Sequence, residues 1–507
     1  MNWSDHLAIA PVAIPALAAP IALLVMRRRR LLGVAVSFAG CLAMLAAAIA
    51  LLVAAQDGAI RSYALGDWPA PFGIVLVVDR LAAIMLVLAA TMGLLSLTHA
   101  VVTAEDRKGW HFHPLLQFQL MGLNGAFLTG DLFNLFVFFE VLLIASYGLM
   151  LHGQGGARLK AGVHYVVVNI VGSSLFLVAL GLLYALTGTL NMADMGLRVT
   201  QVPPADQGLL RVAALLLASV FALKAAIVPL HLWLPRTYAV TTPAVAALFA
   251  ILTKVGVYAM IRVMPQVFGP DAGSAAFAPA PYLSPLAIVT AIVGFAGVFA
   301  ARALREQAAF AVIGSTGTLL IAVAAWRAEA LGAALYYLVH STLAACALFL
   351  VADAVQRRRG AKVDQADAGP VFADRQGVGI LFVLAAVAVT GLPPLSGFIG
   401  KLSILQATGG VGGWGWAWSA ILGTTLIGVI GFARTGSAIF WKSEAQAVPA
   451  RRSPIRGRAD LIAPALACGL LGALSVGAGW ATEQGVLAAG QVLTPADTAR
   501  AVLGGGR

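Results

Sequence analysis

The chain has 507 residues, of which 60% are hydrophobic and only 11% charged, and its mean hydropathy is +0.91. These values exclude a water-soluble domain of this length, whose surface would need far more polar side chains. The net charge of +12 is divided among short segments between apolar runs and forms no single basic face, which argues against a nucleic-acid partner.

Apolar runs of about 20 residues follow one another along the chain without the alternation of barrel strands. We therefore expect an all-α polytopic membrane protein, whose helices satisfy their own backbone hydrogen bonds in lipid. Arg27 to Arg30 follow the first run instead of preceding it, which indicates a retained span and not a signal peptide. The runs predict fourteen spans: Leu7–Met26, Leu31–Ala55, Leu81–Val101, Leu115–Thr129, Leu132–Leu151, Val163–Leu186, Leu209–Leu234, Pro243–Met264, Leu283–Ala301, Ala308–Trp326, Leu331–Ala352, Val378 to about Leu405, Trp414–Trp441 and Leu461–Trp480.

Basic residues alternate between the segments that join these spans. The positive-inside rule places the strongly basic set in the cytoplasm and both termini outside. The other set, which includes Arg61, Arg80 and Arg262, is only thinly basic. The strongly basic segments carry Arg27–Arg30, Arg107, Lys108, Arg158, Lys160, Arg236, Arg302, Arg305, Arg357–Arg359, Lys362, Arg375, Lys442, Arg451, Arg452, Arg456 and Arg458.

Four ionisable residues lie well inside the predicted spans, Glu140, Lys224, Lys254 and Arg434, and a fifth, Lys401, lies in the interrupted twelfth span. A charge at a helix centre costs roughly 2.5–3.5 kcal/mol, so such a set indicates an ion or proton path. The alternative for each is a buried ion pair or a side chain that extends to the interface, which we favour for Arg434. If Glu140 can approach and leave Lys224, the lysine holds its proton when paired and releases it when unpaired.

Histidines are the other candidates for proton relay near neutral pH. His231 and His340 fall in predicted spans, where a hydrogen-bonded structural role is equally compatible with the sequence. His111, His113 and His152 lie in or beside predicted loops, where we expect solvated side chains.

Helix breakers interrupt the seventh and twelfth spans. Pro229 follows Lys224, and Pro393, Pro394 and Gly397 precede Lys401. Because proline lacks the backbone donor, both helices should be broken within the membrane, and broken helices in two halves point to inverted repeats around a transport path. The predicted units are residues 1–112 (helices one to three), 113–265 (first five-helix repeat), 266–442 (second repeat) and 443–507 (final loop and helix fourteen).

Several motifs resemble the D subunit of Mrp/Pha-type monovalent cation/proton antiporters, over nearly the whole chain. Residues 127–141, FLTGDLFNLFVFFEV, and residues 66–73, GDWPAPFG, followed by Asp79 and Arg80, resemble that subunit. Lys224 with Pro229 and His231, Lys254, and GLPPLSGFIGK ending at Lys401 are similar to the wider group of antiporter-like subunits.

The resemblance implies a proton-translocating subunit of a multi-subunit Na⁺ or K⁺/proton antiporter in the bacterial inner membrane. Its partners would be a large A subunit and several small membrane subunits. The expected proton path comprises Glu140 and Lys224 as the input pair, Lys254 at the centre, His340, and Lys401 in the second half, with His231 and Asp131 as further relay candidates. Two positions depart from the family pattern: Ala344 stands where many relatives have lysine, and Arg305, which cannot release a proton, replaces another.

Three rival functions remain at this stage. The same core occurs in the antiporter-like membrane subunits of respiratory complex I, the proton-pumping NADH-quinone oxidoreductase. A carrier for an organic solute is disfavoured because the embedded charges are mostly cationic, and a structural scaffold because it needs none of them. We expect no catalytic residues, bound metal or cofactor, since the sequence has no phosphate-binding glycine loop or haem motif, and Cys41, Cys346 and Cys468 are isolated.

Overall fold

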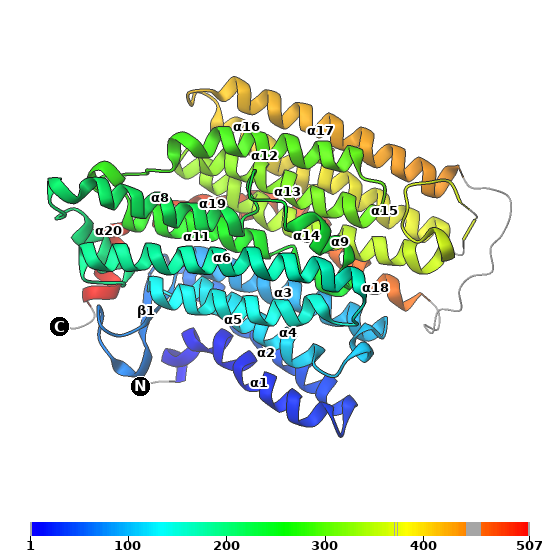
Figure 1. Cartoon of the computed structure of the whole chain (residues 1–507), viewed down its shortest axis with the longest axis horizontal. Coiled ribbons are helices and arrows are strands. Elements are labelled where there is room, and N and C mark those ends of the chain that lie inside the picture. Colours follow the sequence, from blue (N-terminus) through cyan, green and yellow to red (C-terminus); the bar gives the residue numbers. More distant parts are fainter. Residues whose placement is uncertain (1–2, 370, 373, 443–457, 505–507) are drawn as a thin grey trace.

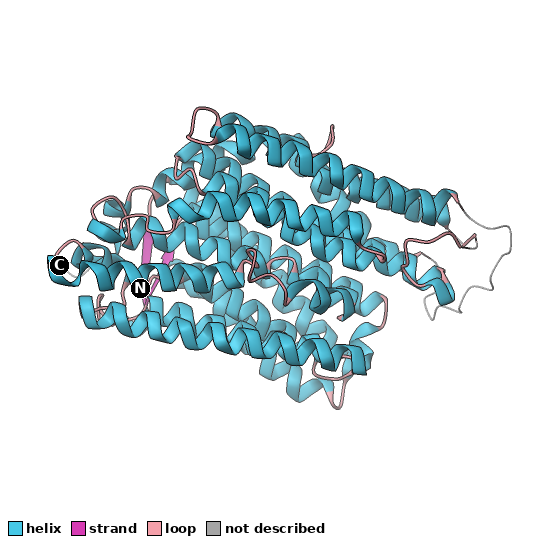
Figure 2. Ribbon diagram, turned by 45° about the horizontal axis from the view of Figure 1, so that its top comes forward, coloured by secondary structure: helices cyan, strands magenta, loops and turns pink. Residues whose placement is uncertain are grey.

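The computed structural model describes residues 3–369, 371–372, 374–442 and 458–504. Most of these residues are helical, and the long helices run side by side along a common direction (Figure 1, Figure 2). The helices are α1 (Ala10–Met26), α2 (Arg30–Ala54), α3 (Arg80–Val102), α4 (Phe112–Leu128), α5 (Leu132–Leu151), α6 (Gly156–Thr187), α7 (Met192–Val199), α8 (Gln207–Lys224), α9 (Leu234–Val240), α10 (Pro243–Phe249), α11 (Leu252–Val267), α12 (Ala280–Ala300), α13 (Leu304–Val323), α14 (Ala328–Arg358), α15 (Arg375–Thr390), α16 (Ser396–Thr408), α17 (Trp414–Gly436), α18 (Ile462–Val476), α19 (Ala478–Val492) and α20 (Pro495–Leu503).

Twelve helical segments in the described residues are long and apolar enough to cross a membrane. The predicted class, an all-α multi-pass membrane protein, is confirmed. Two predicted spans are not among the twelve: Leu115–Thr129 corresponds to α4, which has 17 residues, and the twelfth span is divided into α15 and α16. The count of fourteen and the inverted repeats therefore stay predictions. The last span does not continue to Trp480 as one helix, because α18 ends before Gly477 and α19 begins after it.

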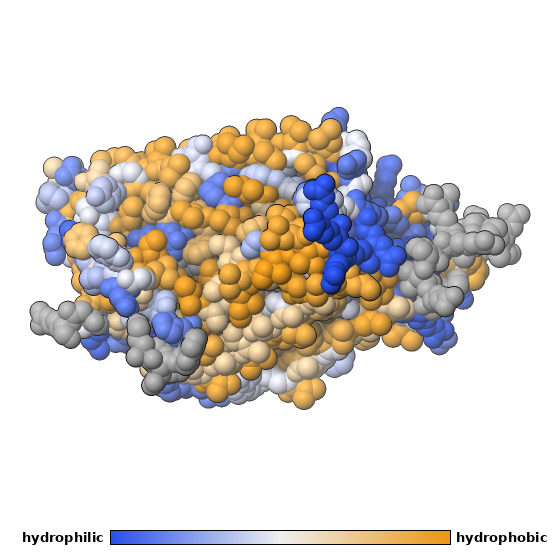
Figure 3. Space-filling model, turned by 90° about the horizontal axis from the view of Figure 1, so that it is seen from below, coloured by the Kyte–Doolittle hydropathy of each residue, from blue (hydrophilic) through white to orange (hydrophobic). Residues whose placement is uncertain are grey.

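The surface agrees with this class. Figure 3 shows apolar side chains over most of the visible face, with hydrophilic side chains gathered toward the two ends of the long axis. Exposed leucine, isoleucine and valine side chains lie along the outer helices, for example Leu24, Ile144 and Leu426. In a membrane protein such a belt faces lipid or neighbouring subunits.

The strongly basic segments contact one another at one end of the bundle. Ion pairs there join segments that the positive-inside rule assigns to the same side. Four examples are Arg30–Asp106, Arg305–Asp364, Arg357–Glu105 and Arg358–Asp460. Arg451, Arg452 and Arg456 lie outside the described residues.

At the opposite end lies a small β-hairpin that the apolar pattern did not predict. Strand β1 (Arg61–Ala64) pairs antiparallel with β2 (Val75–Val78). The Ser62 hydroxyl donates to the Ala501 carbonyl oxygen (2.8 Å), which ties the hairpin to α20. The first and last described segments thus lie at the same end of the bundle (Figure 1).

Arg262, assigned to the thinly basic side, forms a buried ion pair there. It lies in α11 with 6% of its surface exposed and binds both oxygens of Asp79, with Nη2 at 2.8 Å from Oδ1. Burial alone would raise the pKa of the Asp79 carboxyl, but the Arg262 charge holds it below its ordinary value. Asp79 also caps α3 by accepting from the Ala82 amide (2.8 Å).

A second buried charge cluster lies at the basic end of the bundle. Arg357 joins two carboxylates, with Nε at 2.5 Å from Asp353 Oδ2 and Nη2 at 3.2 Å from Glu105 Oε1. His99 binds the same Asp353 oxygen through Nε2 (2.9 Å). Burial and the Asp353 charge raise the pKa of Glu105 above its ordinary value.

The expectation of solvated histidines is right for His111 but wrong for His113 and His152. His113 is buried because its Nε2 bonds Asp106 (3.2 Å), and His152 because its Nε2 bonds the Glu105 carbonyl oxygen (2.9 Å).

Candidate functional site

Glu140 lies on α5, which begins at a well-formed cap. The Asp131 carboxylate accepts from the Asn134 backbone amide (2.8 Å), and burial raises the pKa of Asp131 above its ordinary value. Glu140 is nine residues further along the helix. It is half-buried, and the Ser173 hydroxyl of α6 donates to its Oε1. The structure thus gives Asp131 a capping position and places it away from Glu140.

Lys224 is the last residue of α8 and has 8% of its surface exposed. Its Nζ donates to Asn169 Oδ1 on α6 (3.0 Å). Since Asn169 and Ser173 are one turn apart, Glu140 and Lys224 bind the same face of α6. Among the described residues, however, the expected Glu140–Lys224 ion pair is not formed.

A small cavity lies beside Lys224. Its volume is about 20 Å³, and its lining includes Asn169, Tyr165, Trp233 and Val255. A single water needs about 10–15 Å³ and two to four polar partners, which the lysine amine, the asparagine amide and the tyrosine hydroxyl can supply.

The chain after Lys224 is non-helical until α9, as Pro229 predicts. Ala226 has φ +55°, and side chains satisfy the released backbone groups: Trp233 Nε1 donates to the Leu223 carbonyl oxygen (3.2 Å), and the Val228 amide donates to the Thr290 hydroxyl (3.0 Å). His231 lies in this break and is half-buried. Its Nδ1 has no hydrogen-bond partner within the described part of the chain.

Lys254 lies on α11 and is 1% exposed. Its Nζ donates to two hydroxyls of α13, Ser315 Oγ (3.2 Å) and Thr316 Oγ1 (3.1 Å). Gly256 lets α11 approach the end of α8, because a Cβ there would lie 2.5 Å from the Ala225 nitrogen. Lys254 therefore lies on the helix that packs directly against the end of α8, where Lys224 is located.

The second break holds Lys401. Helix α15 ends at Thr390, and since Pro394 has no N–H, it cannot pair with the Thr390 carbonyl oxygen four residues earlier. Lys401 Nζ donates to this oxygen (2.8 Å) and to Thr425 Oγ1 of α17 (2.7 Å). Lys401 is 4% exposed. The break that contains Pro393 and Pro394 therefore supplies a backbone oxygen as hydrogen-bond partner for this buried amine.

His340 lies on α14 across the same break. Its Nδ1 is 2.9 Å from Ser396 Oγ, and a Cβ on Gly397 would lie 2.9 Å from its Nε2. Ser396, Gly397 and Lys401 are all in the first two turns of α16, so His340 and Lys401 meet the same short helix. Ala344 is buried one turn along α14 and brings no charge to this region.

Two other predicted positions are peripheral. Arg434 is exposed, and its Nη2 donates to the Phe299 carbonyl oxygen (2.5 Å), so it takes no part in a buried ion pair within the described residues. Arg305 binds Asp364, with Nε at 3.1 Å from Oδ2, which gives it a structural partner.

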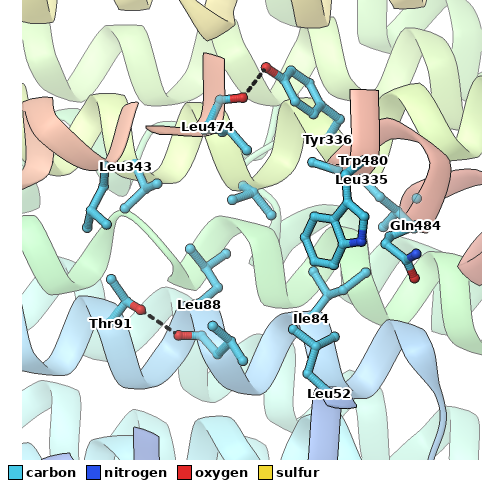
Figure 4. A pocket seen from close by; sticks show the side chains of 15 residues that line it. Leu52, Ile84, Leu88, Thr91, Leu335, Tyr336, Leu343, Leu474, Trp480 and Gln484 are labelled. Atoms are coloured by element: carbon cyan, nitrogen blue, oxygen red, sulfur yellow. Dashed lines mark hydrogen bonds between the residues drawn. The ribbon is translucent and has the colours of Figure 1, made fainter. Parts of the chain in front are cut away.

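An apolar cavity of about 270 Å³ lies elsewhere, between α3, α14, α18 and α19. Figure 4 shows Trp480, Leu335, Ile84 and Leu88 pointing toward it. Because no charged side chain lines it, this cavity does not extend the polar site.

Residues 129–428, more than half of the chain, match the family described as NADH:quinone oxidoreductase/Mrp antiporter, transmembrane. The chain belongs to this family.

Relatives within this antiporter family agree over most of the sequence. The probable D subunit of a K⁺/H⁺ antiporter from Rhizobium meliloti is 42% identical and covers 80% of this chain and 79% of its own length. The D subunit of a Na⁺/H⁺ antiporter from Bacillus subtilis is 34% identical, over 98% of this chain and 99% of its own length.

The solved structures agree in fold. A chain of the Mrp complex from Dietzia sp. DQ12-45-1b superposes with a TM-score of 0.89 and 29% identity, covering 99% of this chain and 100% of that one. A chain of respiratory complex I from Thermus thermophilus has a TM-score of 0.78 at 23% identity, covering 96% of this chain and 98% of that one, and shares the fold.

The neutral partners of the charged residues in this antiporter-family chain were not predicted from the sequence. They are Asn169, Ser173, Ser315, Thr316, Ser396, Thr425 and the Thr390 carbonyl oxygen. One signal was available: Asn169 and Ser173, spaced four residues apart in a predicted span, mark a polar stripe on α6.

Proposed function

We propose that the chain is the proton-translocating D subunit of a multi-subunit Na⁺ or K⁺/H⁺ antiporter. The family, the names of the relatives and the likeness to a chain of an Mrp complex support this function. It is a secondary transporter subunit and carries out no covalent chemistry. Its partners are a large A subunit and several small membrane subunits, in the inner membrane of a bacterium and with both termini outside.

The observation that carries the proposal is the state of the three buried lysines. Lys224, Lys254 and Lys401 are at most 8% exposed, and in the described residues each amine is held by neutral oxygens, without a carboxylate ion pair. A carboxylate partner would fix the charge of the lysine, whereas amide, hydroxyl and carbonyl oxygens leave it able to gain and lose a proton.

The proton path runs from Glu140 to Lys401 through neighbouring helices. Ser173 and Asn169 of α6 connect Glu140 with Lys224, and the cavity beside Lys224 has room for one water, which Asn169 and Tyr165 can orient. Lys254 follows on α11, and His340 and Lys401 meet at α16. His231 is a side branch of this proton path, and Asp131 supports the path by capping α5, the helix that carries Glu140.

The test is cation-dependent proton movement in everted vesicles that contain the complete antiporter. Lys224→Met and Lys254→Met should abolish antiport, and Lys224→Arg should also do so, because arginine keeps its proton. Arg434→Met, an exposed basic residue in a span, is the matched control and should retain antiport. Full antiport in an assembled Lys224→Met complex would refute the proposed path.

The complex I alternative rests on the shared fold and family. It predicts copurification with flavin and iron-sulfur subunits and NADH-dependent proton movement. The antiporter predicts neither, and responds to an imposed Na⁺ or K⁺ gradient alone.

A further inference from the structure

A second polar seam lies between α1, α2 and α4, outside the Glu140–Lys401 path. On α4, Gln117 and Asn124 are two turns apart on one face, and on α2 the facing residues are Ser37, Cys41 and Met44. Gln117 Nε2 donates to the Ser37 carbonyl oxygen (3.1 Å) and contacts Cys41 Sγ (3.5 Å). Asn124 Nδ2 contacts Met44 Sδ (2.8 Å).

Asn124 also closes a defect in α1. Pro15 has no N–H, so the Pro11 carbonyl oxygen lacks its helical donor. Asn124 Nδ2 donates to this oxygen (2.7 Å). The Asn124 side chain thus has a structural role in α1, but this role uses only its nitrogen and leaves Oδ1 without a partner among the described residues.

The acceptor groups of the seam are buried and unpaired. Ser37, Gln117 and Asn124 are each 0% exposed, yet Ser37 Oγ, Gln117 Oε1 and Asn124 Oδ1 have no hydrogen-bond partner among the described residues. A buried polar atom without a hydrogen-bond partner lowers the stability of the fold by about 1–3 kcal/mol. Three such acceptors along one seam therefore indicate that one kind of donor molecule binds to all of them.

The seam begins at the basic end of the bundle. Arg30 and His113 both bind Asp106 Oδ2 there, at 2.5 and 3.2 Å. Asp106 Oδ1 and His113 Nδ1 lack partners in the described chain, and both residues are at most 1% exposed. His113 precedes Gln117 by one helical turn and Asn124 follows it by two, so the unpaired atoms lie at successive levels of α4 from this end to Asn124.

Small side chains border the seam. Between Val12 and Met26, the buried residues of α1 are Pro15, Ala18, Ala19 and Ala22. Beyond Met44, the same face of α2 becomes apolar at Ala48 and Leu51. On the far side of Leu51 lies a separate cavity of about 560 Å³ that includes Tyr63 and Asp67.

We propose that α1, α2 and α4 enclose a file of bound water, a hydrated half-path that opens at the Arg30–Asp106–His113 cluster and ends at Asn124 before the apolar barrier of Ala48 and Leu51. Water can donate to each unpaired oxygen in turn. An alkali cation needs several oxygens around one point, whereas these acceptors are spread along two turns of α4. The half-path is independent of the proposed function, because α5 and Glu140 take no part in it.

The test is brief hydroxyl-radical labelling of the intact complex in lipid nanodiscs, with methionine oxidation read by mass spectrometry. Radicals formed from bound water should oxidise Met44 several-fold faster than Met85 and Met92, which are equally buried on α3 and whose sulfurs contact no hydrogen-bond donor within the described residues. Asn124→Leu and, separately, Gln117→Leu should lower Met44 oxidation toward the rate of these two controls in an assembled complex.

Equal oxidation of Met44, Met85 and Met92 in the wild-type complex would overturn the proposal, whether or not the variants fold. Replacing Na⁺ and K⁺ by choline should leave Met44 oxidation unchanged, and a rise would identify an alkali cation as the occupant instead of water. Antiport by the same samples reports on Glu140–Lys401 separately, so failure of one proposal leaves the other intact.

Discussion

Replacing Arg357 by methionine should destabilise the protein strongly. The side chain joins Glu105 and Asp353, which are 1% and 3% exposed, with nitrogen–oxygen distances of 3.2 and 2.5 Å. His99 still binds Asp353 in the variant, but Glu105 keeps only the weak contact of its Oε2 with the Ala244 amide (3.4 Å). Leaving a buried charge without its partner costs about 3–5 kcal/mol.

The assay is the apparent Tm of the detergent-solubilised complex, followed by size-exclusion chromatography. At about 2 °C per kcal/mol, Arg357→Met should lower the Tm by roughly 6–10 °C. Arg61→Met is the matched control, because Arg61 and Asp57 are 40% and 52% exposed and such a pair contributes at most about 1 kcal/mol. Adding Glu105→Gln to Arg357→Met should recover part of the loss. Equal Tm shifts for Arg357→Met and Arg61→Met would refute the reasoning.

Two further predictions concern α5 and α6. Asn169→Leu removes the oxygen that binds Lys224, so it should reduce antiport and lower the free energy of unfolding by about 1–3 kcal/mol. Ser174→Ala, on the exposed face of α6, is the control and should change neither quantity. Antiport in vesicles and the Tm of the same preparations measure both effects. Asp131→Asn keeps a good helix cap and removes a carboxyl whose pKa is raised by burial. Wild-type stability should fall as the pH rises from about 3.9 through the raised pKa, so the Tm advantage of the variant should grow between pH 4 and pH 7, and a constant Tm difference would contradict this.

The helical class, most of the spans and both helix breaks could be predicted from the sequence alone. This was possible because a charge or a proline within an apolar run is rare and has few structural explanations. Glu140, Lys224, Lys254 and Lys401 stood out for this reason.

The neutral partners did not stand out, because serine and threonine in helices usually bond their own backbone. Thr408, for example, donates to the Ile404 carbonyl oxygen (2.7 Å) and needs no other partner. Only the packing of α11 on α13 distinguishes Ser315 and Thr316, which hold Lys254.

Two histidines near the ends of spans were misassigned for a related reason. Hydropathy locates a residue along the membrane normal only to within a turn or two, and does not tell whether it faces water or another helix. His113 and His152 were therefore placed in solvent, although Asp106 and the Glu105 carbonyl oxygen, which lie on another element, bind and bury them.

The two helix breaks give the buried lysines a particular kind of environment. A regular helix consumes its own carbonyl oxygens, so it has no backbone acceptor for a neighbouring amine. At the second break the missing N–H of Pro394 releases the Thr390 oxygen, and Lys401 binds it. At the first break α8 ends at Lys224, whose amine donates to Asn169 Oδ1. The backbone oxygen of Leu223, which the break releases, accepts a hydrogen bond from the Trp233 side chain instead. In both places the amine is held by dipoles and not by a fixed negative charge, so its proton can leave without stranding a buried carboxylate.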